Sequence, residues 1–420
     1  MKAVSLSWIA SSYLISTAIF QVPFARLGDL IGRKKVFIGG VTLFSLTTFL
    51  CGLSASGLML ILFRALSGIG SAMMFGTNMA ILTSIFKPEE RGKTLGINIA
   101  TVYFALASGP FPGGLLTHYF GWQSLFFTVG VLGVIVIICS SLLFKGEWVE
   151  SKGESFDYFG AVIYAVSLFS LIFGFSKLPE IMAFIWIGIG IIGFTIFVLY
   201  ELNHDQPVFN VRIFAKNKIF TLSPVSALIN YAATSAVAFM MSLYLQYIRG
   251  FDAQHAGFIL IIQALVQSGV SLYAGRLSDR VNPAILATTG MVVILVGLCG
   301  LIFLSVSTSL VILIILLILL GLGFGSFSSP NTNVIMSSVE KRYLGQASAT
   351  MGTMRLTGQA FSMGIVMMAL SLHVGNNIIR PELYPEFMGS FRITFIICAV
   401  LCIIGAYALS FRTKVKKYKH

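Results

Sequence analysis

The chain has 420 residues, of which 57% are hydrophobic and only 10% are charged. A soluble protein carries roughly 25% charged residues, so this composition excludes an ordinary soluble enzyme. The formal net charge is +13, but the basic residues lie between apolar segments, which favours membrane orientation over nucleic-acid binding.

Long apolar segments follow one another along almost the whole chain, and each is long enough to cross a bilayer as a helix. In chain order we predict helices at residues 6–25, 36–55, 58–85, 94–115, 122–144, 157–177, 181–201, 219–247, 255–275, 283–305, 308–332, 345–372 and 391–411. The predicted fold class is therefore all-α, a polytopic membrane helix bundle.

Basic residues divide unequally between alternate loops. One set of loops, together with the C-terminal tail, holds 21 Lys and Arg, whereas the other set holds 5. Cytoplasmic loops carry the excess of basic residues, so we expect the first set and the C-terminus to be cytoplasmic. The expected location is a cell membrane, spanned many times, and most simply the cytoplasmic membrane of a prokaryote.

No pattern for catalysis or metal binding stands out. The five cysteines all fall inside apolar segments without a C-x-x-C pair, so we expect neither a disulfide framework nor a metal site. The loops are short and carry no acid–base pair, nucleophile or phosphate loop. We therefore expect a protein that is not an enzyme.

The chain contains a weak internal repeat. Residues 24–29 are echoed by residues 274–279, and Gly70, Asn78 and Gly92 recur as Gly323, Asn331 and Gly345. We divide the chain into an N-terminal bundle (1–150), two inserted central helices (151–210) and a C-terminal six-helix bundle with a basic tail (211–420). The second half has a helix with no counterpart in the first, so we expect a first helix to be missing before residue 6, and fourteen spans in an intact protein.

The loop after the first predicted helix carries a dense motif, made of Gly28, Asp29, Gly32, Arg33 and Lys34. Glycines permit a tight turn, and Asp29 is suited to accept hydrogen bonds from the N-terminal amides of a neighbouring helix. Arg33 is expected to pair with an acid on the facing bundle and form a latch. Asp279 and Arg280 occupy the corresponding loop of the second half. The alternative is a simple turn with orienting charges.

A second motif lies in the predicted helix 94–115 and contains Ala105, Gly109, Pro110, Gly113 and Gly114. Proline removes a backbone hydrogen bond, and glycines allow close helix contact, so this segment is suited to act as a hinge or a tight seam. The alternative is a packing kink without a mechanistic role.

These motifs together resemble those of the major facilitator superfamily. The Gly28–Lys34 loop is similar to the family's loop between its second and third helices, the 105–114 segment to its antiporter signature, and Arg64–Gly68 to its R-x-x-Q-G signature. With the inserted pair, the chain most resembles the fourteen-helix drug–proton antiporters. The resemblance implies two pseudo-symmetric halves that alternate access, with a proton gradient as energy source and no cofactor.

The sequence departs from this family's pattern in places. Ala25 and Ala105 replace leading glycines, Ser67 replaces a glutamine, and the loop after Asp279 lacks the later glycine and basic pair. Arg64 and Arg355 are the only basic residues deep within predicted spans, and no acid or histidine lies near a span centre. Arginine cannot change its charge, so we expect the proton acceptor to lie in the missing helix.

Candidate coupling and substrate residues lie on the helices that line the cavity in this family. The main candidates are Arg64, Asn78, Tyr103, Tyr231, Gln267, Asn331 and Arg355, and the further ones are Phe104, Phe111, Asn230, Met240, Met241, Tyr244, Gln263 and Asn333. Aromatic and methionine side chains suit bulky apolar or cationic ligands, while amides orient them. Ordinary helix packing stays open as the alternative for each aromatic residue.

The sequence thus predicts a proton-driven exporter of amphipathic or cationic drugs. Its expected partners are a small amphipathic substrate and the lipid bilayer, with no nucleic acid, and we expect it to act as a monomer. Two alternatives stay open: a transporter of a specific metabolite with the same fold, and a truncated membrane protein that does not transport.

Overall fold

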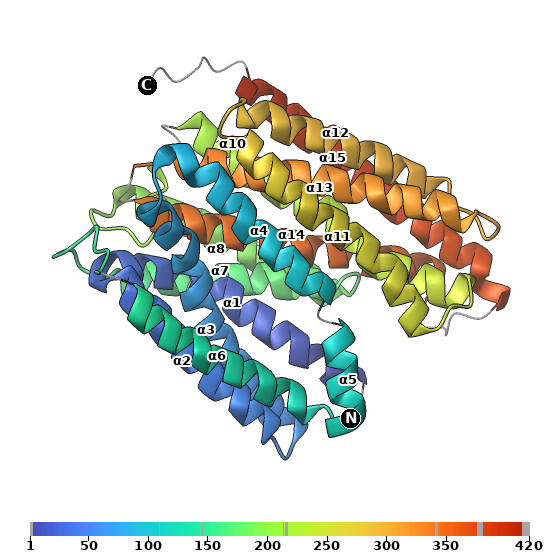
Figure 1. The fold of residues 1–420 in the computed structure, drawn as a ribbon, viewed down its shortest axis with the longest axis horizontal. Helices are drawn as coiled ribbons and strands as arrows, with labels where there is room; N and C mark the ends of the chain where they lie inside the picture. Colours follow the sequence, from blue (N-terminus) through green and yellow to red (C-terminus); the bar gives the residue numbers. More distant parts are fainter. Residues whose placement is uncertain are drawn as a thin grey trace.

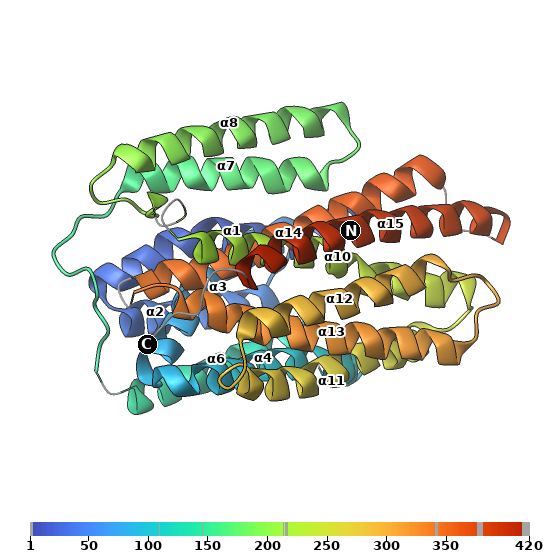
Figure 2. The same cartoon turned by 90° about the horizontal axis from the view of Figure 1, so that it is seen from above.

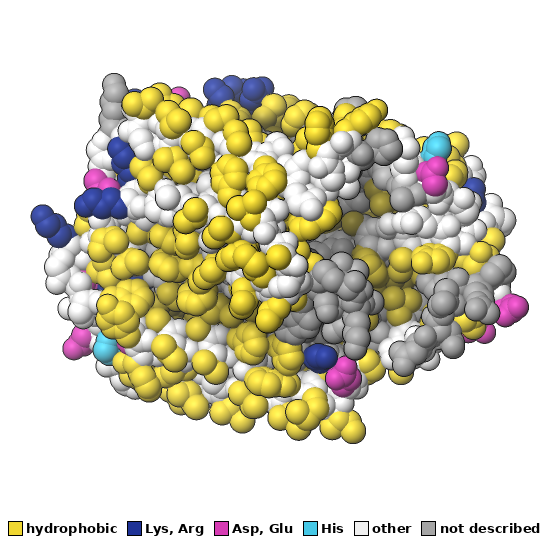
Figure 3. All heavy atoms as spheres, turned by 90° about the horizontal axis from the view of Figure 1, so that it is seen from below, with side chains coloured by type: hydrophobic (Ala, Val, Ile, Leu, Met, Phe, Trp, Pro, Cys, Tyr) yellow, Lys and Arg dark blue, Asp and Glu magenta, His cyan; other side chains and the backbone are white. Residues whose placement is uncertain are grey.

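The structure is a computed structural model that describes residues 3–108, 110–144, 146–212, 214, 217–340, 343–375 and 381–413. These residues form helices and no strand, which confirms the all-α class. Twelve of the described helices are long and apolar enough to cross a membrane. Figure 3 shows the consequence on one face, where hydrophobic side chains cover most of the surface and charged ones lie mainly around its edge.

The first half is built around α3. Its helices are α1 (Ala3–Ile31), α2 (Arg33–Gly52), α3 (Gly57–Ile85), α4 (Arg91–Ser108), α5 (Pro110–Phe120) and α6 (Gln123–Leu143), with a short 3-10 turn η1 at Pro88–Glu90. Both α1 and α2 pack along α3, and α6 packs on α2 (Figure 1). Small residues permit this contact: a methyl group on Gly40 of α2 would lie 2.8 Å from the Gly70 carbonyl oxygen of α3.

The prediction of one helix over 94–115 is wrong. The structure has two helices here, α4 ending at Ser108 and α5 beginning at Pro110, while Gly109 lies outside the described residues. Proline has no N–H to donate and its ring fixes φ, so it suits the first position of a new helix better than a helix interior. In Figure 1, α4 lies along α11 of the second half, whereas α5 lies apart, against α6.

The two inserted helices form a hairpin. They are α7 (Tyr158–Ser176) and α8 (Ile181–Asn203), which pack closely on each other. Figure 2 shows this hairpin as a separate layer beside the other helices, and α7 makes its contacts with α1 and α14. The hairpin therefore touches a helix from each half.

The second half repeats the arrangement of the first. Its helices are α10 (Lys218–Leu243), the π-helical turn η2 (Tyr244–Ile248), α11 (Ala253–Leu277), α12 (Pro283–Ile302), α13 (Leu310–Ser337), α14 (Leu344–His373), the 3-10 turn η4 (Pro381–Leu383) and α15 (Tyr384–Thr413). α12 packs on α13 and α15, and α10 packs on α14 and α15. The core of this half contains Met240, Met241 and Tyr244, all fully buried, with the Tyr244 hydroxyl donating to the Ser305 carbonyl at 2.7 Å.

The two halves meet where α4 packs on α11 and α1 packs on α14, and α14 also packs on α3 and α13 on α4. We call the first two contacts the α4–α11 seam and the α1–α14 seam. In the internal repeat α1 corresponds to α11, and α4 corresponds to α14. Each seam therefore joins one member of each corresponding pair. The space enclosed between the two seams is where a site common to both halves must lie.

Candidate functional site

Basic side chains gather at one end of the helices, which we call the basic end. It includes Arg33 and Lys34 after α1, Lys87 after α3, and Arg276 and Arg280 at the end of α11. Both seams run toward this end. The two loops that were expected to act as a gate, those of Asp29 and Asp279, therefore lie where the two halves are in contact.

Close backbone contact builds the α4–α11 seam. A methyl group on Gly96 would lie 2.8 Å from the Gly275 Cα atom, so the absence of side chains lets the helices approach. Farther along, the Ser268 hydroxyl donates to the Ala100 carbonyl at 2.9 Å. In the α1–α14 seam a methyl group on Gly352 would overlap the Gln21 side chain.

Asp279 closes the basic end of the α4–α11 seam. Its carboxylate accepts hydrogen bonds from the backbone amides of Gly92 at 2.7 Å and Lys93 at 2.8 Å, at the start of α4. Partial burial raises the pKa of the Asp279 carboxyl above its ordinary value, and the two amides oppose that shift because they stabilise the ionised form. The sequence analysis predicted this kind of contact for Asp29; the structure describes it for Asp279, the corresponding residue of the second half.

Asp29 has the equivalent place in the α1–α14 seam but makes different contacts. A methyl group on Gly345, at the start of α14, would lie 2.5 Å from Asp29 Oδ2, so the carboxylate lies directly against that helix. Its Oδ1 accepts from Arg33 Nε at 2.8 Å, and both side chains are fully buried. Arg33 was expected to pair with an acid on the facing bundle; the ion pairs described for it join it to Asp29 and to Glu150, both of which precede the second half, and the latch stays a prediction.

Residues 147–154, which we call the strap, hold the α1–α2 turn. The Arg33 amide donates to the Trp148 carbonyl at 3.0 Å, and the Glu150 and Ser151 amides donate to the Asp29 carbonyl at 3.1 and 3.0 Å. Gly32 has a φ of 119°, which favours glycine, and Lys34 donates its amide to Glu147. Because the strap leads directly into α7, the α1–α2 turn is tied to the inserted hairpin.

A polar cavity of about 70 Å³ lies between the two seams, and we call it the central cavity. It brings together three of the predicted residues, Asn78, Tyr231 and Arg355, from α3, α10 and α14. Residues that the sequence analysis missed complete it: Gln21, Phe75, Asn98, Ser328, Thr332 and Ser348 among others. Asn78 was selected because it is an amide side chain within an apolar helix. Gln21 and Asn98 meet the same criterion and could have been selected from the sequence.

Several polar atoms around the central cavity are buried without a hydrogen-bond partner. They are Gln21 Oε1, Asn98 Oδ1 and Ser328 Oγ, which come from both halves. A buried polar atom without a partner costs free energy unless a ligand or water satisfies it. Arg355 supplies the charge of the site, and its guanidinium lies 5.2 Å from the centre of the Phe75 ring. The lining is suited to contact a polar aromatic molecule with amides and a cation, but at about 70 Å³ the cavity must widen, as it would when the halves move apart, before such a molecule enters.

Other predicted residues lie outside the central cavity. Arg64 donates from Nε to the Ile9 carbonyl at 3.1 Å and lies 4.3 Å from the Tyr13 ring centre, so it joins α3 to α1. Asn331 donates to the Ser223 carbonyl at 3.2 Å and so joins α13 to α10. Gln267 is buried beside the α4–α11 seam, with Nε2 lacking a partner.

The remaining candidates make packing contacts within the helices or lie on the surface. Asn333 donates to the Ser278 hydroxyl at 3.0 Å, and Asn230 is fully buried in α10 without a side-chain partner. The Gln263 carbonyl lies where α11 meets Gly321 of α13. Met240, Met241 and Tyr244 belong to the core of the second half, which favours helix packing, the alternative left open for them. Phe104 is exposed.

The antiporter segment is described only in part. Ala105 is exposed, Pro110 begins α5, and a methyl group on Gly113 would lie 3.7 Å from a Leu125 methyl. Gly109 and the side-chain surroundings of Gly114, Tyr103 and Phe111 lie outside the described residues. The hinge or seam role predicted for this segment stays a prediction.

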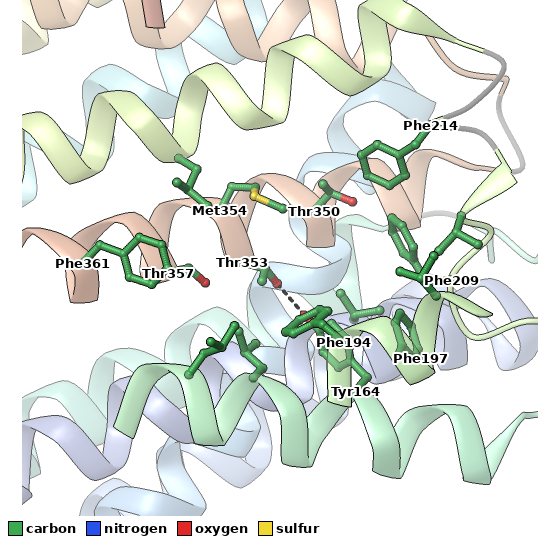
Figure 4. A pocket seen from close by; sticks show the side chains of 16 residues that line it. Tyr164, Phe194, Phe197, Phe209, Phe214, Thr350, Thr353, Met354, Thr357 and Phe361 are labelled. Carbon is green, nitrogen blue, oxygen red and sulfur yellow. Dashed lines mark hydrogen bonds between the residues drawn. The ribbon is translucent and has the colours of Figure 1, made fainter. Parts of the chain in front are cut away.

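A larger apolar cavity, of about 400 Å³, lies between the inserted hairpin and helices α1, α10 and α14. Figure 4 shows Thr353 of α14 pointing toward Tyr164 and Phe194, and the Thr353 and Tyr164 hydroxyls are 3.1 Å apart. Its lining contains aromatic and aliphatic side chains and a few hydroxyls, but no amide or charged group. Because such a lining cannot orient a polar molecule, the central cavity is the better candidate for the substrate site.

Comparison with known proteins gives a consistent picture. A family model described as Major Facilitator Superfamily matches residues 1–363 and, in a second match, residues 225–420. The riboflavin transporter RibZ of Clostridioides difficile is 25% identical over 95% of this chain and 87% of its own length. The multidrug resistance protein Stp of Mycobacterium tuberculosis is 26% identical over 86% of this chain and 68% of its own length.

A solved structure shares the fold. The crystal structure of the human organic anion transporter MFSD10 (TETRAN) superposes with a TM-score of 0.72, covering 96% of this chain and 83% of that one. Its sequence identity is 13%, so the likeness concerns the fold alone. The helical bundle of two matched halves is therefore an arrangement already seen in an experimental structure.

Proposed function

The chain belongs to the Major Facilitator Superfamily, and from that premise we propose that it exports small amphipathic aromatic compounds by alternating access, driven by proton entry. It is a multi-pass membrane protein of a transporter family rather than an enzyme family. In the proposed orientation the basic end and the C-terminus face the cytoplasm, because basic residues are retained on that side. The proposed working unit is a monomer.

The central cavity is the observation that carries this proposal. Asn78 and Gln21 come from the first half, and Tyr231, Ser328 and Arg355 from the second, so a ligand there would contact both halves. Alternating access requires a site whose access changes when the halves move against each other. A substrate that forms hydrogen bonds with the unpartnered polar atoms around the cavity would gain binding free energy from them.

The chemistry of the cavity refines the substrate class. Arg355 is the only charged residue among the described residues that line it. A half-buried arginine such as Arg355 attracts anions and the faces of aromatic rings, and it repels cations. We therefore propose neutral or anionic aromatic substrates in preference to the cationic drugs that composition and family resemblance suggested. The relatives named for riboflavin transport and for multidrug resistance support this range without choosing within it.

A transporter of one defined metabolite is the second candidate function. The small volume of the central cavity and its many polar groups favour it, because such a site rejects molecules that leave those groups unpaired. Competition separates the two candidates. An exporter of broad range is inhibited by several unrelated aromatic compounds, whereas a specific transporter is inhibited only by close analogues of its substrate.

The test is uptake into everted membrane vesicles with an imposed pH gradient. Three fluorescent aromatic compounds of similar size would be compared, one cationic, one neutral and one anionic. The proposal expects uptake of the neutral or anionic compound that stops when the gradient is collapsed. Uptake of the cation alone would contradict the proposed substrate class, and uptake that is independent of the gradient would contradict proton coupling.

A further inference from the structure

Two buried acidic side chains lie where the inserted hairpin reaches the basic end. Asp157 immediately precedes α7 and Glu201 is in the last turn of α8. Asp157 is 6% exposed and Glu201 is 1% exposed. Neither takes part in the central cavity or in the two seams, and buried carboxylates in a membrane protein are costly unless they have a function.

The two carboxylates face the same small volume beside Gly160. Asp157 Oδ1 accepts from the Gly160 amide at 2.9 Å, and the Tyr200 hydroxyl donates to the same oxygen at 3.3 Å. A methyl group on Gly160 would overlap Asp157 Oδ2 and would lie 2.9 Å from Glu201 Oε1. Only the glycine at this position leaves room for both acids.

No described basic side chain forms an ion pair with either acid. Asp157 Oδ2 and both oxygens of Glu201 are buried without a well-formed hydrogen bond, although the amides of Val208 and Phe209 face Glu201. All the ion pairs among the described residues involve other acids. Two ionised carboxylates in such a place would repel each other with little compensation.

A third buried charged group, Arg26 of α1, connects the acid pair to the strap. Arg26 of α1 is 5% exposed, and its Nε has no hydrogen-bond partner. Its other nitrogens bind the strap, with Nη1 donating to Ser151 at 3.1 Å and Nη2 pairing with Glu154. Arg26 also exerts an electrostatic attraction on Glu201. Through its partner Glu154, three residues before Asp157, Arg26 lies at the strap that holds the α1–α2 turn, and it is near enough to Glu201 to attract that carboxylate.

We propose that Asp157 and Glu201 together bind one proton, shared between their carboxylates, and that Arg26 transmits the loss of that proton to the α1–α2 turn. With the proton bound, the pair carries a single negative charge opposite the single positive charge of Arg26. Without it the pair carries two negative charges, and the Arg26 guanidinium turns toward them, so that its Nη2 leaves Glu154. The strap is then held less tightly on the turn that adjoins the α1–α14 seam.

Other charged and titratable groups lie near the Asp157–Glu201 pair and affect its proton binding. They are Tyr200 and Glu154, already described, His204, whose ring stacks on Tyr200 at 5.2 Å, and Arg212, which donates to the Leu202 carbonyl. Arg212 is exposed, so Arg26 is the buried cation that responds. The inference rests on the proposed function for the role of this proton in coupling, whereas the proton site itself does not depend on transport.

Infrared spectroscopy of the purified full chain in detergent tests the proton site without any transport. The expected result is a carbonyl-stretch band of a protonated carboxylic acid that is present at neutral pH and is lost at higher pH. Glu201→Gln and Asp157→Asn should each abolish this band, since both keep the side-chain volume. Glu180→Gln, which alters an exposed carboxylate before α8, should retain it. Thermal unfolding of each variant separates loss of the site from loss of the fold.

Three outcomes of this experiment overturn the proton site. One is the absence of such a band in the unmodified chain, and another is a band that persists in both Glu201→Gln and Asp157→Asn. The third is a titration that moves to lower pH when sodium replaces choline in the buffer, because a metal cation would then occupy the site.

Distance measurements by electron spin resonance test the transmission. Spin labels at Lys35→Cys and Val281→Cys would report on the separation of the two halves at the basic end, with the native cysteines replaced. Both positions are exposed. The unmodified background should change its distance distribution with pH, and Glu201→Gln should keep the low-pH distribution throughout. Arg26→Gln should lose the pH response while keeping the infrared band.

The outcomes distinguish this inference from the proposed function. A pH response in Glu201→Gln equal to that of the background would overturn the role of the acid pair. An intact infrared band together with vesicles that fail to transport would overturn the exporter and leave the proton site standing. Gradient-driven transport without the infrared band would overturn the proton site and leave the proposed exporter standing.

Discussion

At the scale of single residues, Asp29 and Asp279 occupy equivalent positions in the two halves yet are neutralised in different ways. Asp279 relies on the two amides at the start of α4, whose dipole favours an anion. Asp29 relies on Arg33, four residues later in the same turn. The second half lacks a counterpart of that arginine at the same spacing, because Pro283 begins α12 directly. The α4–α11 contact is therefore the one that depends on helix amides alone.

Substitutions of Asp279 should weaken the closed basic end in a graded manner. Asp279→Ala removes both acceptors, and loss of a helix-capping acceptor costs about 1 kcal/mol, or roughly a fivefold change in a two-state ratio. Asp279→Asn keeps one acceptor and should have a smaller effect. The measurement is the rate at which a membrane-impermeant maleimide labels Ser348→Cys, which is buried beside the central cavity and donates to the Phe75 carbonyl of α3 at 3.1 Å. Equal labelling rates in all three backgrounds would contradict the role given to Asp279.

Arg355 should determine which substrates bind. Arg355→Gln removes the cation of the central cavity, and a hydrogen bond to a charged group is worth about 1.5–3 kcal/mol, so transport of an anionic aromatic substrate should fall roughly tenfold or more. Arg355→Lys should restore only part of it, because lysine lacks the planar group that lies over Phe75. Arg392→Gln, at an exposed position on α15, is the matched control and should transport normally. An unchanged substrate preference in Arg355→Gln would remove the central cavity from consideration.

At the scale of helices, the interruption at Pro110 separates two tasks. α4 contacts the second half through Gly92 and Gly96, and α5 contacts α6 within the first half. One straight helix would have to carry both contacts along a single axis. The break therefore leaves α4 able to pack closely on α11 while the remainder of the first half stays together.

Gly275 should be the most sensitive position of the α4–α11 seam. A methyl group there would lie 2.6 Å from the Gly92 carbonyl oxygen and 2.6 Å from the Gly96 Cα atom, which are backbone atoms that cannot turn away. Overpacking of this kind costs about 1–3 kcal/mol, so Gly275→Ala should shift the halves apart at the basic end and slow transport. Gly269→Ala on the same helix meets nothing within 4 Å and is the control. The readout is transport rate with thermal stability measured in parallel, and equal rates in the two variants would refute the seam.

At the scale of the whole molecule, composition and apolar segment length predicted the membrane bundle, because each span is a local property of the sequence. The inserted hairpin and the gating loops followed from spacing and family resemblance. The central cavity was predicted only in part, since Asn78 and Arg355 stand out as polar residues in apolar helices but their meeting depends on how the halves pack. Asp157 and Glu201 did not stand out in the sequence, because both lie near span ends and burial between two helices cannot be read from position along the chain.

The arrangement of the two halves makes a prediction about the transport cycle. Alternating access requires the seams to separate at the basic end in each cycle. The Ser268 hydroxyl lies 2.9 Å from the Ala100 carbonyl across the α4–α11 seam, so Ala100→Cys and Ser268→Cys should form a disulfide in the closed arrangement. Oxidation should then stop transport, and reduction should restore it. Met291→Cys offers a control bond to Cys402, whose Sγ donates to the Met291 backbone carbonyl at 3.3 Å; this bond would lie within the second half, join no moving parts and leave transport unchanged. Full transport by a completely cross-linked Ala100–Ser268 variant would mean that the seam does not open, and the alternating-access reading of this structure would be wrong.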